Sequence, residues 1–378
     1  MKRCLSILLT VAMLVPFASV PISASAATVE TQSVSASYDC IEASSAPSVN
    51  IDDKVLKDVR NKIYSHESNF TVSVVVDNLD SNFLRAYSQK LLEQAFEHTG
   101  NPIGGDYITH QIDGWSYSSS ASGRNGVYNM NINYSLAYYT TKQQEEELDK
   151  KVDEILAGLD LDGKSDYEKV CAIYDYMTSH VTYDGTAVKN HDSDNIPFSA
   201  YGALCKGSAV CQGYANALYR LLLTEGIDSR IITGVGLNNV HAWNIVKIGN
   251  KYYNLDSTWD SQRPEYAFFL CSDKDFKQHT VSDEFKTKQF LSSYPISTES
   301  IIRIIRIMGD LDSDKKITAA DSLKVLRLSV GLEDVPEDLL QFADVNGDGS
   351  VDSSDALDIL RYSVGFTSEG STIGTSSK

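Results

Sequence analysis

Apolar side chains recur at two spacings in the first half of the chain, and each spacing predicts a type of secondary structure. Spacings of three to four residues, which place apolar side chains on one face of a helix, occur in 55–63, 83–96, 145–159 and 165–177. β-Branched or alternating runs, which are typical of strands, occupy 70–76 and 127–139. Residues 101–126 are rich in Gly, Ser and Asn, and we expect loops around short strands there. This order predicts an α/β lead-in domain.

The helix that begins near residue 165 carries its own start signal. Ser165 and Glu168 have the spacing of a capping box, in which each side chain bonds the backbone N–H of the other residue. The apolar face that follows is made of Val170, Ile173, Tyr174 and Met177. Cys171 lies beside this face, and we therefore expect it to be a core residue.

The centre of the chain combines one apolar helix pattern with two strand patterns. Ala215–Glu225 is apolar at helical spacing and begins four residues after Cys211. Strand patterns occupy Ala242–Ile248 and Tyr252–Leu255, and Gly249-Asn250 between them predicts a hairpin turn. The hairpin would bring the start of its first strand and the end of its second strand to one edge.

Three side chains of this central region can form an acyl-transfer site. Cys211 stands at a helix start, where unsatisfied N–H groups and the helix dipole favour the thiolate, which is the nucleophile. His241 precedes the first hairpin strand and can act as general base and acid. Asp256 ends the second strand, where it can orient the imidazole. We predict a catalytic triad of Cys211, His241 and Asp256.

Each of these signals has a plainer interpretation when it is taken alone. An isolated cysteine is more often a buried core residue than a nucleophile, and an isolated histidine is more often structural than catalytic. His279 is a rival histidine that we interpret as structural. Trp243 and Trp259 fit a cleft wall and plain core packing equally well.

Composition restricts the possible partners. The chain has 378 residues, of which 42% are hydrophobic and 22% charged, and this is ordinary for globular domains. Its formal net charge of −18 argues against a nucleic-acid surface and against binding to anionic membranes. We therefore expect neither nucleic acid nor membrane insertion.

The N-terminus has the pattern of a secretory signal peptide. Lys2 and Arg3 precede the apolar run Leu5–Phe17, which is too short to span a membrane, and Ala24-Ser25-Ala26 fits a cleavage site. We expect a signal peptide over 1–26 and a secreted, extracellular protein. Cleavage would leave an odd number of cysteines, which allows one free thiol and at most two disulfides. Their pairing stays open among Cys40, Cys171, Cys205, Cys211 and Cys271.

The central motifs resemble those of transglutaminase-like proteins. The resemblance covers residues 145–285 and rests on Val210–Ala215 around the cysteine, His241–Asn244, and Asp256–Asp260, although Ser257 stands where the family often has proline. It implies an α+β, papain-like core with Cys211 as nucleophile, His241 as base and Asp256 as the orienting residue. It identifies no oxyanion side chain.

The resemblance leaves the acyl acceptor open. Water would make the protein a peptidase or amidase on protein substrates, which we favour, and an amine would make it a protein-glutamine transglutaminase that cross-links proteins. A non-catalytic binding or adhesion module is the third alternative.

An acidic segment repeats with a period of 34 residues near the C-terminus. Asp310–Asp321 and Asp344–Asp355 place oxygen donors at loop positions 1, 3, 5, 9 and 12, with a backbone carbonyl at position 7, as EF-hand-type Ca²⁺ loops do. Each loop precedes a short helix, predicted at Ser322–Val330 and Ala356–Val364. We therefore predict two Ca²⁺ sites and no cofactor for catalysis. The predicted ligands are Asp310, Asp312, Asp314, Lys316, Thr318, Asp321, Asp344, Asn346, Asp348, Ser350, Asp352 and Asp355.

The duplicated loops resemble a type I dockerin, the module that docks proteins onto the cohesin domains of cellulosomal scaffoldins. The resemblance implies a cohesin partner, with recognition pairs at Ala319-Ala320 and Ser353-Ser354 beside Leu326-Arg327 and Leu360-Arg361. Lys315 stands where such loops usually have glycine at position 6. We therefore predict weaker Ca²⁺ binding in the first loop.

These patterns predict an α+β protein with an α/β N-terminal region, a papain-like transglutaminase core and a small all-α, Ca²⁺-binding dockerin. The expected divisions are a signal peptide at 1–26, a disordered leader at 27–50, the lead-in domain at 51–155, the catalytic domain at 156–290, a linker at 291–308, the dockerin at 309–367 and a disordered tail at 368–378.

Overall fold

The structure is a computed structural model of the whole chain. It describes residues 30–36, 49–78, 80–187, 195–263, 266–302, 307–312, 314, 316–335, 337–366 and 372–375. The expected signal peptide and Cys40 lie outside these residues. Two compact units divide at Ile301, and each is described by itself below.

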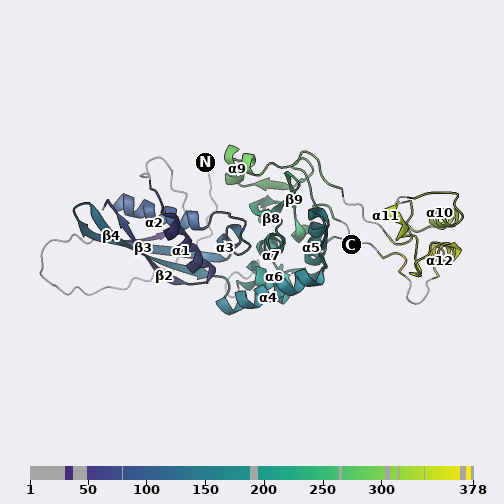
Figure 1. Ribbon diagram of the computed structural model, residues 1–378, viewed down its shortest axis with the longest axis horizontal. Coiled ribbons are helices and arrows are strands. Elements are labelled where there is room, and N and C mark those ends of the chain that lie inside the picture. The colour runs from purple at the N-terminus through teal and green to yellow at the C-terminus, as the bar shows by residue number, and fades with distance from the viewer. Residues whose placement is uncertain are drawn as a thin grey trace. The chain divides into compact units, whose positions relative to one another are not determined.

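The N-terminal region is a four-stranded antiparallel sheet with two helices on one face (Figure 1). The sheet has the strand order β1-β3-β4-β2. Its members are β1 (Glu30–Ala36), β2 (Asn69–Val76), β3 (Ile112–Arg124) and β4 (Val127–Tyr138), and the helices are α1 (Asp53–Tyr64) and α2 (Ser81–Ala95). Alternate side chains of β2 are buried, because the strand has one face on the helices and the other in solvent. The helix and strand patterns at 55–63, 70–76, 83–96 and 127–139 correspond to α1, β2, α2 and β4.

Two segments of this sheet differ from the sequence-based expectation. Residues 101–126 were expected to hold only loops and short strands, yet β3 is 13 residues long. It pairs along its length with β4 through a tight turn at Asn125-Gly126, where both residues have positive φ, the geometry that asparagine and glycine favour. Serines occupy alternate positions of β3, so the sequence lacks the clear alternation of apolar and polar residues that predicts a strand. The leader expected to be disordered at 27–50 contains β1, which adds to the β3 edge by antiparallel pairing.

The second region packs helices around the almost completely buried helix α7 (Cys211–Thr224). The sheet beside it has the order β10-β7-β8-β9. The surrounding elements are α4 (Lys142–Gly158), α5 (Asp166–His180), β5 (Thr182–Tyr183), a 3-10 turn (Ile196–Phe198), α6 (Ala200–Lys206), β6 (Ser208–Ala209), β7 (Ser229–Gly236), β8 (Asn239–Ile248), β9 (Lys251–Leu255), α8 (Ser257–Asp260), β10 (His279–Val281), a second 3-10 turn (Asp283–Lys286) and α9 (Lys288–Ser293). The structure has the Ser165–Glu168 capping box of α5, with both reciprocal bonds formed.

The boundary between these regions lies earlier than the expected residue 155. The hydrophobic cluster under the first sheet extends from Val49 to Leu136. Helix α4 contributes Leu148 and Val152 to the cluster around α7 instead, because its apolar face turns toward α6 and α7.

A buried ion pair joins the two regions. Arg230 of β7 donates from Nε and Nη2 to Asp106, at 2.6 and 2.9 Å, and the same carboxylate accepts the backbone N–H of Ile231 at 2.9 Å. Asp106 belongs to the short helix α3 (Asp106–Thr109) of the N-terminal region. The pair therefore fixes the first region against the sheet that carries part of the candidate site.

The expected linker at 291–308 begins with ordered contacts to the second region. The N–H of Tyr252 donates to the carbonyl of Pro295 at 3.0 Å, and the N–H of Ile301 donates to that of Leu270 at 3.0 Å. Residues 295–301 are therefore part of the second region and not of a linker.

The second unit is a small helical domain with its own core. Its helices are α10 (Ala319–Ser329), α11 (Glu337–Leu340) and α12 (Ser353–Ser363), and α10 packs against α12. Ile373 is buried in this core, and the N–H of Met308 donates to Thr375 at 2.9 Å. Residues 372–375 therefore close this domain, although the tail at 368–378 was expected to be disordered.

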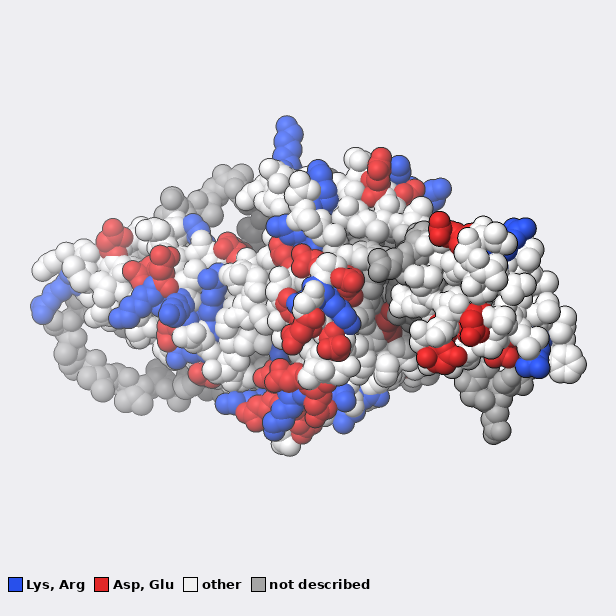
Figure 2. Space-filling view, turned by 45° about the vertical axis from the view of Figure 1, so that its right-hand side comes forward, with Lys and Arg blue, Asp and Glu red and all other residues white. Residues whose placement is uncertain are grey.

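Charges of both signs are interspersed over the face drawn in Figure 2, and among the described residues of that face no broad basic area is visible. Within the described part of the chain, no helix combines the length and the apolar character needed to cross a membrane.

Replacement of Asp106 by asparagine should destabilise the unit that ends at Ile301. Arg230 would stay buried without its carboxylate, and loss of one partner of a buried pair costs about 3 kcal/mol of unfolding free energy. Chemical denaturation measures this loss. Lys151→Ala is the control, since it removes an exposed 3.4 Å pair with Glu154 and should cost less than about 0.5 kcal/mol. Equal losses in the two variants would contradict the prediction.

Candidate active site

The candidate nucleophile stands at the first position of the buried helix α7. Val210 is the N-cap residue and provides no side-chain cap, so Cys211 lies where the first backbone N–H groups of the helix lack intrahelical partners. Gly213 allows this helix start to pack closely, because a Cβ there would lie 2.5 Å from the carbonyl oxygen of Pro197. Cys211 itself is half-buried.

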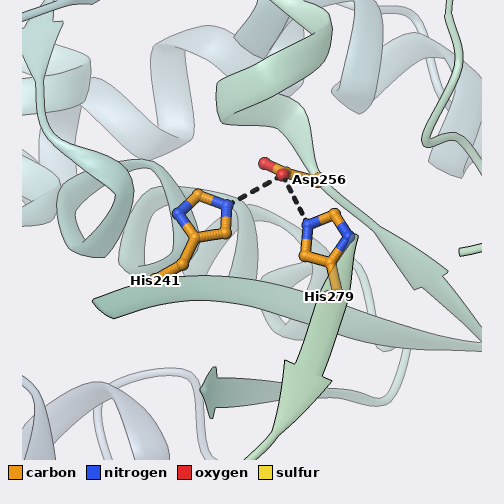
Figure 3. Close-up of side chains that lie close together, drawn as sticks. All are labelled: His241, Asp256 and His279. Atoms are coloured by element: carbon orange, nitrogen blue, oxygen red, sulfur yellow. Dashed lines mark hydrogen bonds and ion pairs between the residues drawn. The ribbon is translucent and has the colours of Figure 1, made fainter. Parts of the chain in front are cut away.

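The predicted hairpin brings the candidate base and its partner together. β8 and β9 pair antiparallel with Ile248 opposite Lys251, and Asp256 follows directly after β9. Nε2 of His241 lies 2.8 Å from Oδ2 of Asp256, and their side chains are 7% and 0% exposed (Figure 3). His241 is the third residue of β8, so it lies inside the strand and not before it as expected.

Neighbouring residues hold the hairpin against the helix and leave space for the imidazole. Nδ2 of Asn244 on β8 donates to the carbonyl of Ala215 on α7 at 3.0 Å. Gly236 on β7 has no side chain to obstruct His241, whereas a Cβ there would lie 3.0 Å from Cδ2 of the ring. Strand β8 and the start of α7 are therefore held in a fixed relation.

The electrostatics of the site favour a protonated His241 beside an ionised Asp256. Burial lowers the pKa of His241, but hydrogen bonds to Asp256 and Cys211 outweigh burial and raise it to about 9. Burial raises the pKa of Asp256, but hydrogen bonds from His241 and His279 outweigh it and hold this pKa below its usual value. His241 can thus carry a proton at neutral pH between a carboxylate and a thiol.

His279, interpreted as structural from the sequence, lies at this site. Its Nε2 is 3.1 Å from Oδ2 of Asp256, the same oxygen that bonds His241 (Figure 3). The sequence has no spacing signal for this contact, because His279 reaches Asp256 only through the pairing of the short strand β10 with β7.

The two tryptophans have different environments. Trp243 is 1% exposed and belongs to the core cluster beside the sheet. The ring of Trp259 is half-buried and stacks on His241 with centroids 5.0 Å apart and planes at 22°. Trp259 therefore forms a wall of the candidate site, whereas Trp243 is a core residue.

Cys205 and Cys271 are free thiols that lie outside the candidate triad. Burial raises the pKa of Cys205 to about 11 and that of Cys271 to about 12, so both stay protonated at neutral pH. Cys171 is half-buried on α5 and packs against the core around α7, as expected.

Gln212 follows the cysteine but its amide is already engaged. Nε2 of Gln212 donates to the carbonyl oxygen of His110 at 2.8 Å, and this bond fixes the start of α7 to the N-terminal region. The Gln212 side chain therefore makes a structural contact through at least one of its two amide N–H groups.

The duplicated acidic loops adopt matching conformations in the second unit. In the first loop, Asp321 is buried and accepts the N–H groups of Leu311 and Thr318, at 2.8 and 2.9 Å. In the second, Asp355 is buried and accepts those of Val345 and Asp352, at 3.0 and 2.9 Å.

Carboxylate oxygens gather in the first loop. One oxygen from each of Asp310, Asp312 and Asp314 lies within 4.8 Å of the others. An all-oxygen donor set of this kind fits Ca²⁺. Lys315 lies outside the described residues, but the matching Gly349 of the second loop has a φ of +84°.

Comparisons with known proteins identify two families of domains in the chain. Residues 153–257 match the transglutaminase-like superfamily, and residues 308–362 match the type I dockerin domain. The chain therefore contains a transglutaminase-like core followed by a type I dockerin. The mixed helix-and-sheet fold, with a helical C-terminal domain, agrees with the fold class predicted from the sequence.

Individual relatives match only in part. Kyphoscoliosis peptidase from Homo sapiens is 27% identical over 122 residues, which are 29% of this chain and 18% of that protein, and the Mus musculus protein matches to the same extent. The chain thus spans less than a fifth of these curated relatives. A solved TGase structure has 18% identity and a TM-score of 0.29 over 50% of this chain and 51% of that one. A candidate cysteine protease from Cytophaga hutchinsonii has 18% identity and a TM-score of 0.24 over 39% and 65%.

Replacement of Asp256 by asparagine should lower the pKa of His241. The change removes the carboxylate charge that helps raise this pKa to about 9. The rate of Cys211 alkylation by iodoacetamide, followed against pH, should therefore show its alkaline inflection at least about one unit lower. Asp228→Asn is the matched control, because Asp228 bonds His98 at 3.0 Å away from the site. An inflection that stays near pH 9 in Asp256→Asn would refute the assignment.

Proposed function

We propose that the protein is a cysteine-dependent acyl-transfer enzyme whose triad is Cys211, His241 and Asp256. The observation that carries the proposal is the 2.8 Å bond between His241 and Asp256, together with the hydrogen bond between His241 and Cys211 at the start of α7. Since Nε2 of His241 bonds Asp256, Nδ1 is the ring nitrogen left to exchange a proton with the thiol.

The reaction follows from these positions. Sγ of Cys211 attacks the carbonyl carbon of an amide, and the first N–H groups of α7 can donate to the oxyanion. The His241 imidazolium then gives its proton to the amine nitrogen, the C–N bond breaks, and a thioester remains on Cys211. Neutral His241 takes a proton from water, whose oxygen attacks the thioester. The carboxylic acid leaves, and the thiolate and imidazolium are restored.

Water is our proposed acyl acceptor, so that the enzyme is a peptidase or amidase on protein or peptide substrates. The name of the partial relative kyphoscoliosis peptidase supports this choice. If an amine took the place of water as the acyl acceptor, the enzyme would be a transglutaminase. If the Cys211 thiol were unreactive, the protein would be a non-catalytic binding module. Both alternatives are outcomes of the test below.

The dockerin would attach this enzyme to a cohesin domain of an extracellular scaffold. Leu326 and Leu360 are 43% and 41% exposed at equivalent positions of α10 and α12, and apolar side chains at this exposure favour a protein partner. The Ala319-Ala320 and Ser353-Ser354 pairs are also exposed, and they would contact the cohesin at the starts of α10 and α12.

Calcium would hold the two dockerin loops. In the first loop the oxygen ligands would be Asp310, Asp312, Asp314, Thr318 and Asp321, with the carbonyl of Lys316. In the second they would be Asp344, Asn346, Asp348, Asp352 and Asp355, with the carbonyl of Ser350. The expected signal peptide at 1–26 agrees with an extracellular scaffold, where Ca²⁺ is abundant.

The enzyme should release new amino termini or ammonia from a protein substrate in a Cys211-dependent way. The assay uses dimethylcasein with and without monodansylcadaverine, and it follows hydrolysis and amine incorporation separately. We expect hydrolysis in the wild type and a loss of at least about 10³-fold in Cys211→Ala. Dominant amine incorporation would instead establish a transglutaminase.

The control is Cys205→Ala, which removes a half-buried thiol elsewhere and should leave the rate unchanged. If wild-type Cys211 reacts with iodoacetamide no faster than free cysteine, and His241→Ala does not alter its rate, the catalytic proposal fails.

The second Ca²⁺ loop should bind more tightly than the first. Gly349 adopts a φ of +84°, and a lysine at the equivalent position costs about 1 kcal/mol, or about fivefold in affinity. Calorimetric titration of the full chain should resolve two affinities. Lys315→Gly should tighten the weaker site, and Gly349→Lys should weaken the tighter one. Two equal affinities in the wild type would contradict this prediction.

A further inference from the structure

His279 occupies a position that packing alone does not explain. Its side chain is 1% exposed, and four aromatic rings surround it. Their centroids lie 3.8, 4.3, 5.0 and 5.3 Å from that of the imidazole, and the rings belong to Phe276, Trp259, Trp243 and Phe268. A phenyl ring would fill such an enclosure without the cost of burying polar nitrogens. An imidazole is favoured there only if its nitrogens find partners.

The partner of His279 is the carboxylate that also holds His241. Oδ2 of Asp256 receives Nε2 of His241 at 2.8 Å and Nε2 of His279 at 3.1 Å (Figure 3). Oδ1 of Asp256 accepts the backbone N–H of Trp259 at 3.1 Å. An ionised carboxylate only accepts hydrogen bonds, so both Nε2 atoms carry hydrogen. Nδ1 of His279 faces the carbonyl of Lys277 at 3.2 Å.

This arrangement has two effects on Asp256. The N–H of His279 fixes the carboxylate in the plane where it meets His241. It also draws part of the negative charge on Oδ2 away from His241, because two donors share one oxygen. The aromatic enclosure keeps water from replacing the second donor.

We propose that His279 is a positioning residue for the acyl-transfer site, which orients Asp256 and limits how strongly this carboxylate holds the proton of His241. The inference rests on the proposed function, since it concerns the same triad. His279 touches neither substrate nor reacting atoms in this role. It acts through Asp256.

Other ionisable groups near Asp256 do not change charge on the alkaline side. Burial raises the pKa of Asp260 to about 6, so this carboxyl is ionised above neutral pH. Burial and the nearby carboxylates hold the pKa of Tyr174, which donates to Asp260, well above 10. The guanidinium of Arg263 lies over the ring of Phe268 at 4.9 Å and stays charged. Cys211 is the reporter thiol itself.

The test compares iodoacetamide alkylation of Cys211 against pH in the wild type, His279→Phe and His279→Gln. Phenylalanine fills the enclosure but donates no hydrogen bond, so Asp256 should hold the His241 proton more strongly. We expect the alkaline inflection to rise by about half a unit to one unit in His279→Phe. His279→Gln keeps an N–H donor and should return most of the way to the wild-type inflection.

His98→Phe is the matched control. His98 is also a largely buried histidine bonded to an aspartate, Asp228, at 3.0 Å, but it lies outside the site. This variant should unfold at a lower temperature and keep the wild-type inflection. An unchanged or lowered inflection in a folded, fast-reacting His279→Phe protein would overturn the inference and leave the triad intact. A slow wild-type thiol would instead overturn the proposed function.

A second measurement covers the case in which His279→Phe does not fold. In the wild type, the Nε2–H resonance of His279 should shift with the same midpoint as the His241 ring when pH rises from 7 to 10, because both donate to one oxygen. Proton–nitrogen NMR correlation spectra of the imidazoles measure this. A His279 resonance that does not respond at the His241 midpoint would overturn the inference.

Discussion

The candidate site depends on one carboxylate that has no contact with solvent. Asp256 is 0% exposed, and a buried charge of this kind is stable only when donors surround it. Three N–H groups meet it, from His241, His279 and the backbone of Trp259. They come from strand β8, strand β10 and helix α8. The carboxylate therefore requires all three elements to be in place, and the fold around it is the arrangement that provides them.

The core around the site holds these elements in fixed positions relative to one another. Residues 213–223 of helix α7 are buried, so its start cannot move relative to the sheet without opening the hydrophobic cluster around this helix. Asn244 bonds this helix directly from β8. Arg230 and Gln212 tie the same elements to the N-terminal region. The N-terminal region therefore helps to hold the site in place, although it contributes no residue to the proposed triad.

Local signals in the sequence predicted much of this, and contacts between distant strands did not appear in it. The Ser165–Glu168 box and the Gly249-Asn250 turn depend on neighbouring residues, and both were predicted correctly. The predicted hairpin places His241 and Asp256 at one edge, and the structure has them in contact there. The contact between His279 and Asp256 did not appear in the sequence, because β10 is only three residues long and is placed by its pairing with β7. The full length of β3 was not predicted, because its many serines obscure the alternation of apolar and polar residues that indicates a strand. The turn signal Asn125-Gly126 was nevertheless present.

The two units are stabilised by different physical means, and this separates their responses to conditions. The first unit buries a large apolar core, and its site is held by hydrogen bonds that depend on the charges of His241 and Asp256. The second has a small core around Val325 and Ile359, and we expect the proposed Ca²⁺ ions to supply much of the stability that so small a core lacks. Asp321 and Asp355 already order their loops by accepting backbone N–H groups. If Ca²⁺ occupies the loops as proposed, it would neutralise their carboxylates, and attachment would then depend on Ca²⁺ while the reactivity of the thiol would depend on pH.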